Sequence, residues 1–332
     1  MQHLIIYHVN LNLFYSYPAD PSLMIETSIQ TDFLDLFYPD IAEFPLENGN
    51  RLNLLTLKIR NNAFAYDDLV ELLGNKLYHF ALSRTEVATL KQKDQLNTLI
   101  SKAKSKLREY IEKEKASARA GQNEGGELGE LLLYCLLECH LNAPKILSKL
   151  EIKTSNQMYV NGADGVHLLK VNETDYQLVF GESKLHSDLA QGIYDAFDSI
   201  ATLLNNQKNK LNFEIDLVNS QLVKEVFDQP AYDILKSILL PSAREDLTNM
   251  DYSFGIFLGF DMEITTEELK KTNAEFRAHL RQKIASEIQS KVASINYQIR
   301  KQEFVGYTFY VYVIPFSNLS AHRVAIINQL IQ

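Results

Sequence analysis

The stretch Gly162–Leu189, "GADGVHLLKVNETDYQLVFGESKLHSDL", predicts a β-hairpin that ends in charged side chains. Two apolar segments, residues 165–171 and 176–185, are separated by "NETD", a run of turn-forming residues. The second segment is apolar up to its glycine and then continues as Glu-Ser-Lys, residues 182–184. Ionised side chains are rarely buried without a partner. An acid and a base at the end of a core strand therefore indicate a functional site.

The geometry of a strand places Glu182 and Lys184 together. Side chains alternate between the two faces, so residues two apart project from the same face, about 7 Å apart along the strand. On the preceding strand, Asp164 lies between Gly162 and Gly165, and these glycines permit close approach or unusual backbone angles. If the two segments pair as a hairpin, the carboxylates of Asp164 and Glu182 lie within reach of each other.

Two neighbouring carboxylates repel each other, so we expect this pair to need a cation at neutral pH. Hard oxygen ligands without a Cys or His cluster favour Mg²⁺ or Mn²⁺ over zinc. Lys184 can then stabilise developing charge or orient an attacking water, as in metal-assisted phosphodiester hydrolysis. The competing interpretation is that Glu182 and Lys184 form a surface ion pair at a strand end, which contributes little to stability.

The pattern of Asp164 followed by Glu182-Ser183-Lys184 resembles the motif of the PD-(D/E)xK nuclease superfamily. Ala163 stands where the written motif has proline. The resemblance implies a restriction-endonuclease-like mixed sheet flanked by helices. It also implies a Mg²⁺-dependent nuclease in which Asp164 and Glu182 hold the metal and Lys184 positions the nucleophilic water.

The resemblance also implies supporting residues outside the hairpin. Superfamily members usually carry a glutamate on the helix before the strands, and "GGELGELLLYCLL" offers Glu130 and, as the weaker match, Glu127. Many members have Gln or Tyr on the following helix, where this chain has Gln191 and Tyr194. His167, three residues after Asp164, is a candidate phosphate contact, although such a histidine is more often a half-buried strand residue.

More narrowly, the run "GELGE…NGADGVHLL…LVFGESKL" resembles the nuclease subunit family, HamA, of the Hachiman anti-phage defence system. The specific match covers residues 120–205, about a quarter of the chain. The resemblance implies a DNA-degrading effector that acts with a superfamily 2 helicase subunit (HamB-like) and is held in check by it. Neither composition nor spacing indicates that partner.

Outside the motif, strands interleaved with helices predict an α/β (α+β) fold around a mixed sheet. We expect an N-terminal α+β region, residues 1–120, which opens with a strand and ends in a basic helix that could dock a partner. A nuclease domain follows in residues 121–332, with its motif core at 125–205. Helices are expected at 66–82, 187–205 (with Ser187 as N-cap) and 267–298.

The net charge of the chain and the charge of two of its segments give different indications about DNA binding. The formal net charge is −9, but residues 91–119 hold nine Lys and Arg against four acidic residues, and residues 270–302 hold eight against two. Both segments read as long helices. A solvated helix face explains such a charge run most simply, whereas a DNA-binding groove needs only local positive charge.

Composition excludes several classes of protein. The chain has 332 residues, of which 46% are hydrophobic and 23% charged, and no apolar run reaches the ~18 residues of a membrane helix. We expect no membrane association, no secretory signal and a cytoplasmic location. Cys135 and Cys139 lack a second Cys/His pair for zinc and are expected to pack in a helix. No phosphate-binding loop occurs, so ATP chemistry would come from a partner.

A second hypothesis of a different class stays open from the sequence. In this alternative the site is catalytically vestigial, and the chain is a DNA-binding or partner-docking subunit of a defence complex.

Overall fold

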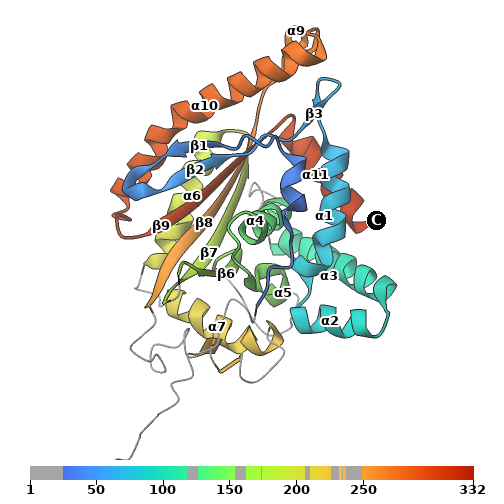
Figure 1. The fold of residues 1–332 in the computed structure, drawn as a ribbon, viewed down its shortest axis with the longest axis vertical. Coiled ribbons are helices and arrows are strands. Elements are labelled where there is room, and N and C mark those ends of the chain that lie inside the picture. Colours follow the sequence, from blue (N-terminus) through green and yellow to red (C-terminus); the bar gives the residue numbers. More distant parts are fainter. Residues whose placement is uncertain are drawn as a thin grey trace, which may run out of the picture.

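The computed structural model describes residues 25–117, 126–153, 162–172, 174–205, 210–225, 232–233, 235–236 and 249–332. Within these ranges the chain forms a seven-stranded mixed β-sheet with helices on both faces, and a small two-stranded ribbon (Figure 1). This arrangement confirms the predicted α/β class. The opening strand expected in residues 1–14 and most of the glycine-rich segment 118–126 lie outside the described residues.

The main sheet has seven strands in the described part of the chain. In spatial order they are β1 (Ala42–Pro45), β2 (Arg51–Leu54), β9 (Thr308–Phe316), β8 (Asn249–Asp261), β7 (Asp175–His186), β6 (Gly165–Lys170) and β5 (Lys145–Ser148). The central strands β2, β9, β8 and β7 are parallel, whereas β1, β6 and β5 run antiparallel to their neighbours. β8 and β9 are apolar without alternation because helices cover both of their faces. A separate ribbon pairs β3 (Ile59–Arg60) with β4 (Ala63–Phe64).

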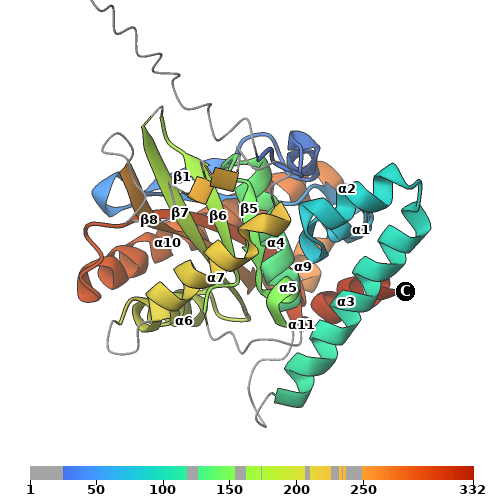
Figure 2. The same cartoon turned by 90° about the horizontal axis from the view of Figure 1, so that it is seen from below.

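The helices divide between the two faces of the sheet (Figures 1 and 2). They are α1 (Tyr66–Ala81), α2 (Arg84–Gln92), α3 (Leu96–Ser117), α4 (Glu127–Cys139), α5 (Lys149–Lys153), α6 (Leu189–Leu204), α7 (Lys210–Glu225), α9 (Thr266–Leu269), α10 (Asn273–Lys301) and α11 (Leu319–Ile331), with 3-10 turns η2 (Thr31–Leu36) and η3 (Glu47–Gly49). α4 packs on β7 and β8, and α1 and α11 cover α4 from outside. α6 lies on the other face, with α10 against it. None of the described helices combines the length and apolar character that a bilayer crossing needs.

α4 is the central helix of the fold. Every one of its residues is buried, including both cysteines, which are free thiols. Because α4 is buried on every side, the prediction that Cys135 and Cys139 serve packing is confirmed. A Cβ atom at Gly129 would lie 3.1 Å from the Ser183 hydroxyl, so this glycine lets α4 approach β7 closely.

The predicted hairpin is confirmed, and its register brings the two acidic positions together. Gly165 pairs with Gly181 in the antiparallel ladder of β6 and β7. The Asp164 N–H donates to the Gly181 carbonyl at 2.8 Å, which extends the pairing by one residue and sets Asp164 beside Glu182. Glu182 lies near the carboxyl end of β7, the edge where open α/β sheets usually place their ligand sites.

Several predicted boundaries are corrected. Asp188, not Ser187, caps α6, since its carboxylate accepts from the Ala190 N–H at 2.8 Å. The basic segment 91–119 is divided between two helices, because Asp94 adopts a left-handed conformation (φ 55°) between α2 and α3. The segment 267–298 is also divided, because a capping box at Thr272 starts α10 anew.

The N-terminal part of the chain extends the main sheet. β1 pairs with β2, and β2 pairs in parallel with β9. The sequence did not predict β5, which adds the strand at the opposite edge. The domain boundary near residue 120 stays a prediction.

Candidate active site

Glu182 and Lys184 project from the same face of β7, as predicted. The Lys184 Nζ lies 2.6 Å from Glu182 Oε1, and both side chains are largely buried, with 24% and 13% of their surface exposed. The alternate positions, Ser183 and Leu185, face α4 instead. The strand therefore divides its polar residues between an ion pair on one face and a hydroxyl on the other.

Asp164 is held by three donors at the start of β6. Its Oδ2 accepts from the Ser183 backbone N–H at 2.8 Å and from the Ser183 hydroxyl at 2.7 Å. Its Oδ1 accepts from the Lys149 ammonium at 2.9 Å. Hydrogen bonds to the ionised form favour it, so this environment keeps Asp164 charged although it is buried.

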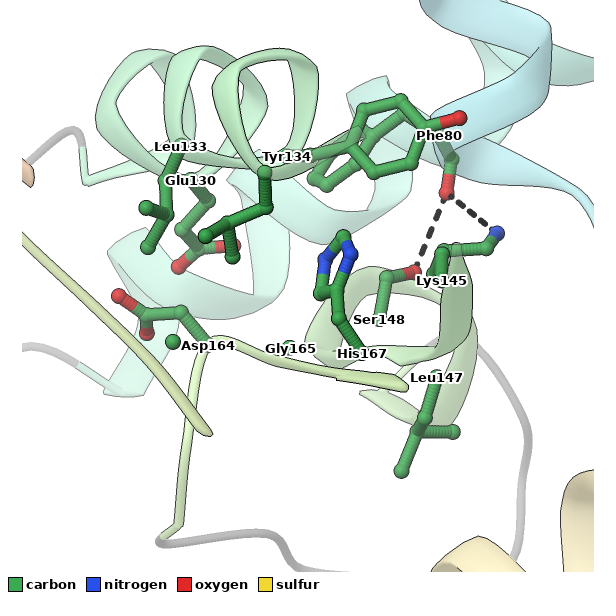
Figure 3. Close-up of a pocket in the computed structure, with 12 residues that line it drawn as sticks. Phe80, Glu130, Leu133, Tyr134, Lys145, Leu147, Ser148, Asp164, Gly165 and His167 are labelled. Carbon is green, nitrogen blue, oxygen red and sulfur yellow. Dashed lines mark hydrogen bonds between the residues drawn. The ribbon is translucent and has the colours of Figure 1, made fainter. Parts of the chain in front are cut away.

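Glu130, on the first turn of α4, faces Asp164. Figure 3 shows the two carboxylates turned toward one another, one from the helix and one from the start of β6. Glu130 Oε1 accepts from the Tyr110 hydroxyl at 2.7 Å and lies 3.4 Å from Lys149 Nζ. Glu130 Oε2 is buried and has no hydrogen-bond partner among the described residues. Both carboxylates line a cavity of about 10 Å³, roughly what one water needs.

The surroundings of the three carboxyl groups give them different pKa values. Burial raises the pKa of Glu130 to about 7, with Asp164 adding to the effect and Lys149 opposing it. Burial and then the Asp164 carboxylate raise the pKa of Glu182 to about 7, although Lys184 opposes them. Burial also disfavours ionised Asp164, but Lys149 and Lys184 outweigh it and lower the pKa of Asp164. Two carboxyls poised near neutrality beside an ionised one are typical of functional sites.

The donor set fits a small hard cation. Asp164 and Glu130 share one cation, the Lys149 ammonium, and one Glu130 oxygen is unpaired among the described residues. In the described ranges no three Asp, Glu, His or Cys side chains form a ready cage for a metal. Mg²⁺ is usually held by one or two carboxylates and completes its shell with water and phosphate oxygens, so two carboxylates suffice.

The family model for HamA matches residues 31–330. The chain belongs to the HamA family. This confirms the narrower of the two resemblances, and membership suggests a role in Hachiman anti-phage defence. No curated protein matches the chain. The match spans the sheet and all of the described helices, whereas the sequence motif covered only residues 120–205.

Two of the supporting residues predicted for this HamA-family chain make no described hydrogen bond or ion pair with the acidic cluster, although His167 lines the same cavity as Glu130 and Asp164. The Gln191 amide is exposed on α6 and donates to Asp195 Oδ1 at 2.7 Å. The His167 ring is buried, and its Nδ1–H donates to the Ala143 carbonyl at 2.8 Å. Burial lowers the pKa of His167 to about 3, so the ring is neutral and serves the core.

The two remaining candidates are placed as follows. Glu127 is buried on the first turn of α4, and burial raises its pKa. Tyr194 is 44% exposed on α6, and the Lys301 ammonium lies 5.5 Å from its ring centroid. Neither side chain contacts Asp164 or Glu182 through a described hydrogen bond or ion pair.

The sequence did not single out three residues that contact the candidate carboxylates, namely Tyr110, Lys149 and Ser183. Alternation correctly placed Ser183 on the opposite face from Glu182, but it did not predict that the Asp164 carboxylate accepts from the Ser183 hydroxyl. Tyr110 and Lys149 come from α3 and α5, which no spacing rule connects with the hairpin. Only the tertiary fold brings them to the carboxylates.

Proposed function

We propose that this chain is a Mg²⁺- or Mn²⁺-dependent deoxyribonuclease, the effector of a Hachiman defence system that acts with a superfamily 2 helicase partner. The observation that carries the proposal is the buried pair of Asp164 and Glu130, which share one cation beside the Glu182–Lys184 pair. Family membership supports the defence role.

Each residue of the cluster has a distinct part in this proposal. Asp164 and Glu182 would hold the metal, and Glu130 would support it or orient a water beside it. When bound, the metal would neutralise charge on the scissile phosphate. Ser183 fixes the direction of the Asp164 carboxylate through its two hydrogen bonds. Lys184 would orient the attacking water and stabilise the negative charge that develops on the phosphate.

A route for the DNA backbone is part of the proposal. α3 borders the site, since its Tyr110 donates to Glu130. The same helix carries most of the lysines of the basic segment, and several of them are exposed. Lysines beside a cluster of acids can contact phosphates and offset the repulsion between the acids and DNA. α10, the second basic helix, lies against α6 and β1.

The test is degradation of plasmid DNA by the purified chain, alone and together with the proposed superfamily 2 helicase partner. We expect degradation in Mg²⁺ that stops on chelation, and loss of at least about 10³-fold in Glu182→Gln or Lys184→Met. Circular dichroism would check that both variants fold. DNA binding without degradation in every combination would favour a vestigial, partner-docking subunit.

A further inference from the structure

Lys149 lies between Asp164, which the proposed function assigns to the metal, and Glu130, which it assigns to the support of that metal. Its ammonium is 2.9 Å from Asp164 Oδ1 and 3.4 Å from Glu130 Oε1. The backbone is tied to the same place, because the Lys149 N–H donates to the Asp164 carbonyl at 3.0 Å. The first residue of α5 therefore sets a positive charge at the centre of the acidic cluster.

Lys145, four residues earlier, shows what a structural lysine looks like in this fold. Its ammonium donates to the carbonyls of His79 and Leu82 at 3.0 and 3.1 Å, and it also contacts Glu151. These carbonyls lie at the carboxyl end of α1, where the last carbonyls of a helix lack partners within it, so Lys145 caps that helix. The described side-chain partners of Lys149 are two carboxylates, and carboxylates are what Mg²⁺ binds.

We propose that Lys149 is an internal counter-cation that occupies the metal position and must be displaced when the metal binds. The inference rests on the proposed function. Ser183 already donates twice to Asp164 Oδ2, so the metal must approach through Oδ1, which Lys149 occupies. A divalent ion and an ammonium within ~4 Å of one buried carboxylate repel strongly. Both cannot occupy the site.

This arrangement gives Lys149 two opposing effects. In the metal-free chain it neutralises Asp164 and Glu130, which would otherwise repel each other in a buried place. Toward the metal it is a competitor, since binding must break both of its ion pairs. Lys149 thus sets a threshold of metal concentration below which the carboxylates stay paired with the protein's own charge.

The first test is metal affinity, measured by calorimetry with Mn²⁺ or Mg²⁺ on the full chain without DNA. Lys149→Met keeps the length of the side chain and removes its charge, and we expect it to bind the metal about tenfold or more tightly than the wild type. We also expect a lower melting temperature without metal that recovers when metal is added. Weaker or unchanged affinity would overturn the proposal.

Lys76→Met is the matched control. The Lys76 side chain is 15% exposed and that of Lys149 is 19% exposed, so both are similarly buried. Lys76 pairs with Asp32 at 2.9 Å, on α1 and away from the cluster. We expect its removal to leave metal affinity unchanged. A gain as large as that of Lys149→Met would show a general charge effect and overturn the proposal.

A second measurement uses the wild-type chain, so it does not depend on how Lys149→Met folds. Amine labelling read by mass spectrometry should modify Lys149 faster when metal is bound, while labelling of Lys76 stays constant. Slower or equal labelling of Lys149 would contradict displacement.

Asp164→Asn distinguishes failure of the Lys149 proposal from failure of the proposed nuclease function. If neither it nor the wild type binds metal, the proposed function fails as well. If only the wild type binds and Lys149→Met gains nothing, the Lys149 proposal fails alone.

Discussion

The two ends of α4 each bury a glutamate, and the two carboxylates differ in how many hydrogen-bond partners they have. Glu138, on the last turn, accepts from Arg84 at 2.9 Å and from the backbone N–H groups of Lys145 at 2.8 Å, Ile29 at 3.0 Å and Ser28. Glu130, on the first turn, accepts from Tyr110 and contacts Lys149, and its second oxygen has no partner in the described ranges. One carboxylate is fully satisfied and the other is not.

The difference distinguishes a structural charge network from a reactive one. The network around Glu138 continues through Arg84 to Glu225 at 3.0 Å, and so ties α2, α4 and α7 together. A buried network in which every polar group has a hydrogen-bond partner stabilises a single arrangement of its side chains. A buried network that lacks a partner is typical of a site where a ligand supplies it. We therefore assign stability to the Glu138 end and chemistry to the Glu130 end.

The largest expected effect on stability is at Arg84. Arg84→Met leaves the carboxylates of Glu138 and Glu225 buried without their shared cation, which costs about 3–5 kcal/mol of unfolding free energy. Chemical denaturation measures it. Cleavage per folded molecule should be unchanged, because Arg84 does not contact the candidate site. A loss below about 1 kcal/mol would show that the network is not structural.

A matched pair of substitutions tests the comparison within one helix. At pH 8, Glu138→Gln should lose about 2 kcal/mol of unfolding free energy, since it removes the charge that Arg84 needs and two of its acceptor sites. Glu130→Gln should instead gain about 1 kcal/mol at pH 8. Burial raises the pKa of Glu130 to about 7, so its ionisation opposes folding above that pH.

The pH dependence of the unfolding free energy tests whether ionised Glu130 destabilises the fold. A raised folded-state pKa adds stability below the ordinary pKa of glutamate, and this stability is lost as the pH rises through about 7. The gain from Glu130→Gln should therefore disappear by pH 5. If both variants lose stability equally at both pH values, the two ends of α4 do not differ in the way we describe.

A smaller effect than those of the substitutions is expected when the metal affinity of the wild-type chain is measured at different pH values. Glu130 and Glu182 have pKa values raised to about 7 by burial, so metal binding must release protons near neutrality. Affinity should strengthen from pH 6 to pH 8 by up to about tenfold per unit. Calorimetry in buffers of different ionisation enthalpy measures the protons released. An affinity that does not change with pH would remove both carboxyls from the site.

The hairpin shows how much of the site the sequence could predict. Strand alternation and the length of the turn are local rules. They correctly placed Glu182 beside Lys184 and the backbone of Asp164 opposite Glu182, although the Asp164 carboxylate binds Ser183. The α/β class followed equally well from interleaved strands and helices. These features depend on residues close together in the chain.

The missed features depend on distant contacts or on local competition between caps. Lys149 and Tyr110 reach the carboxylates only because α5 and α3 pack beside α4. Ser187 and Asp188 are both acceptable caps by propensity, and the backbone geometry selected Asp188. β5 is only four residues long, too short for its periodicity to be recognised.

The most direct test of the account is the single-turnover rate of DNA cleavage in Mg²⁺ by Glu182→Gln and Arg84→Met, each expressed per folded molecule. We predict a loss of at least about 10³-fold for Glu182→Gln and a rate near that of the wild type for Arg84→Met. Cleavage by Glu182→Gln at the wild-type rate would contradict the assignment of the site.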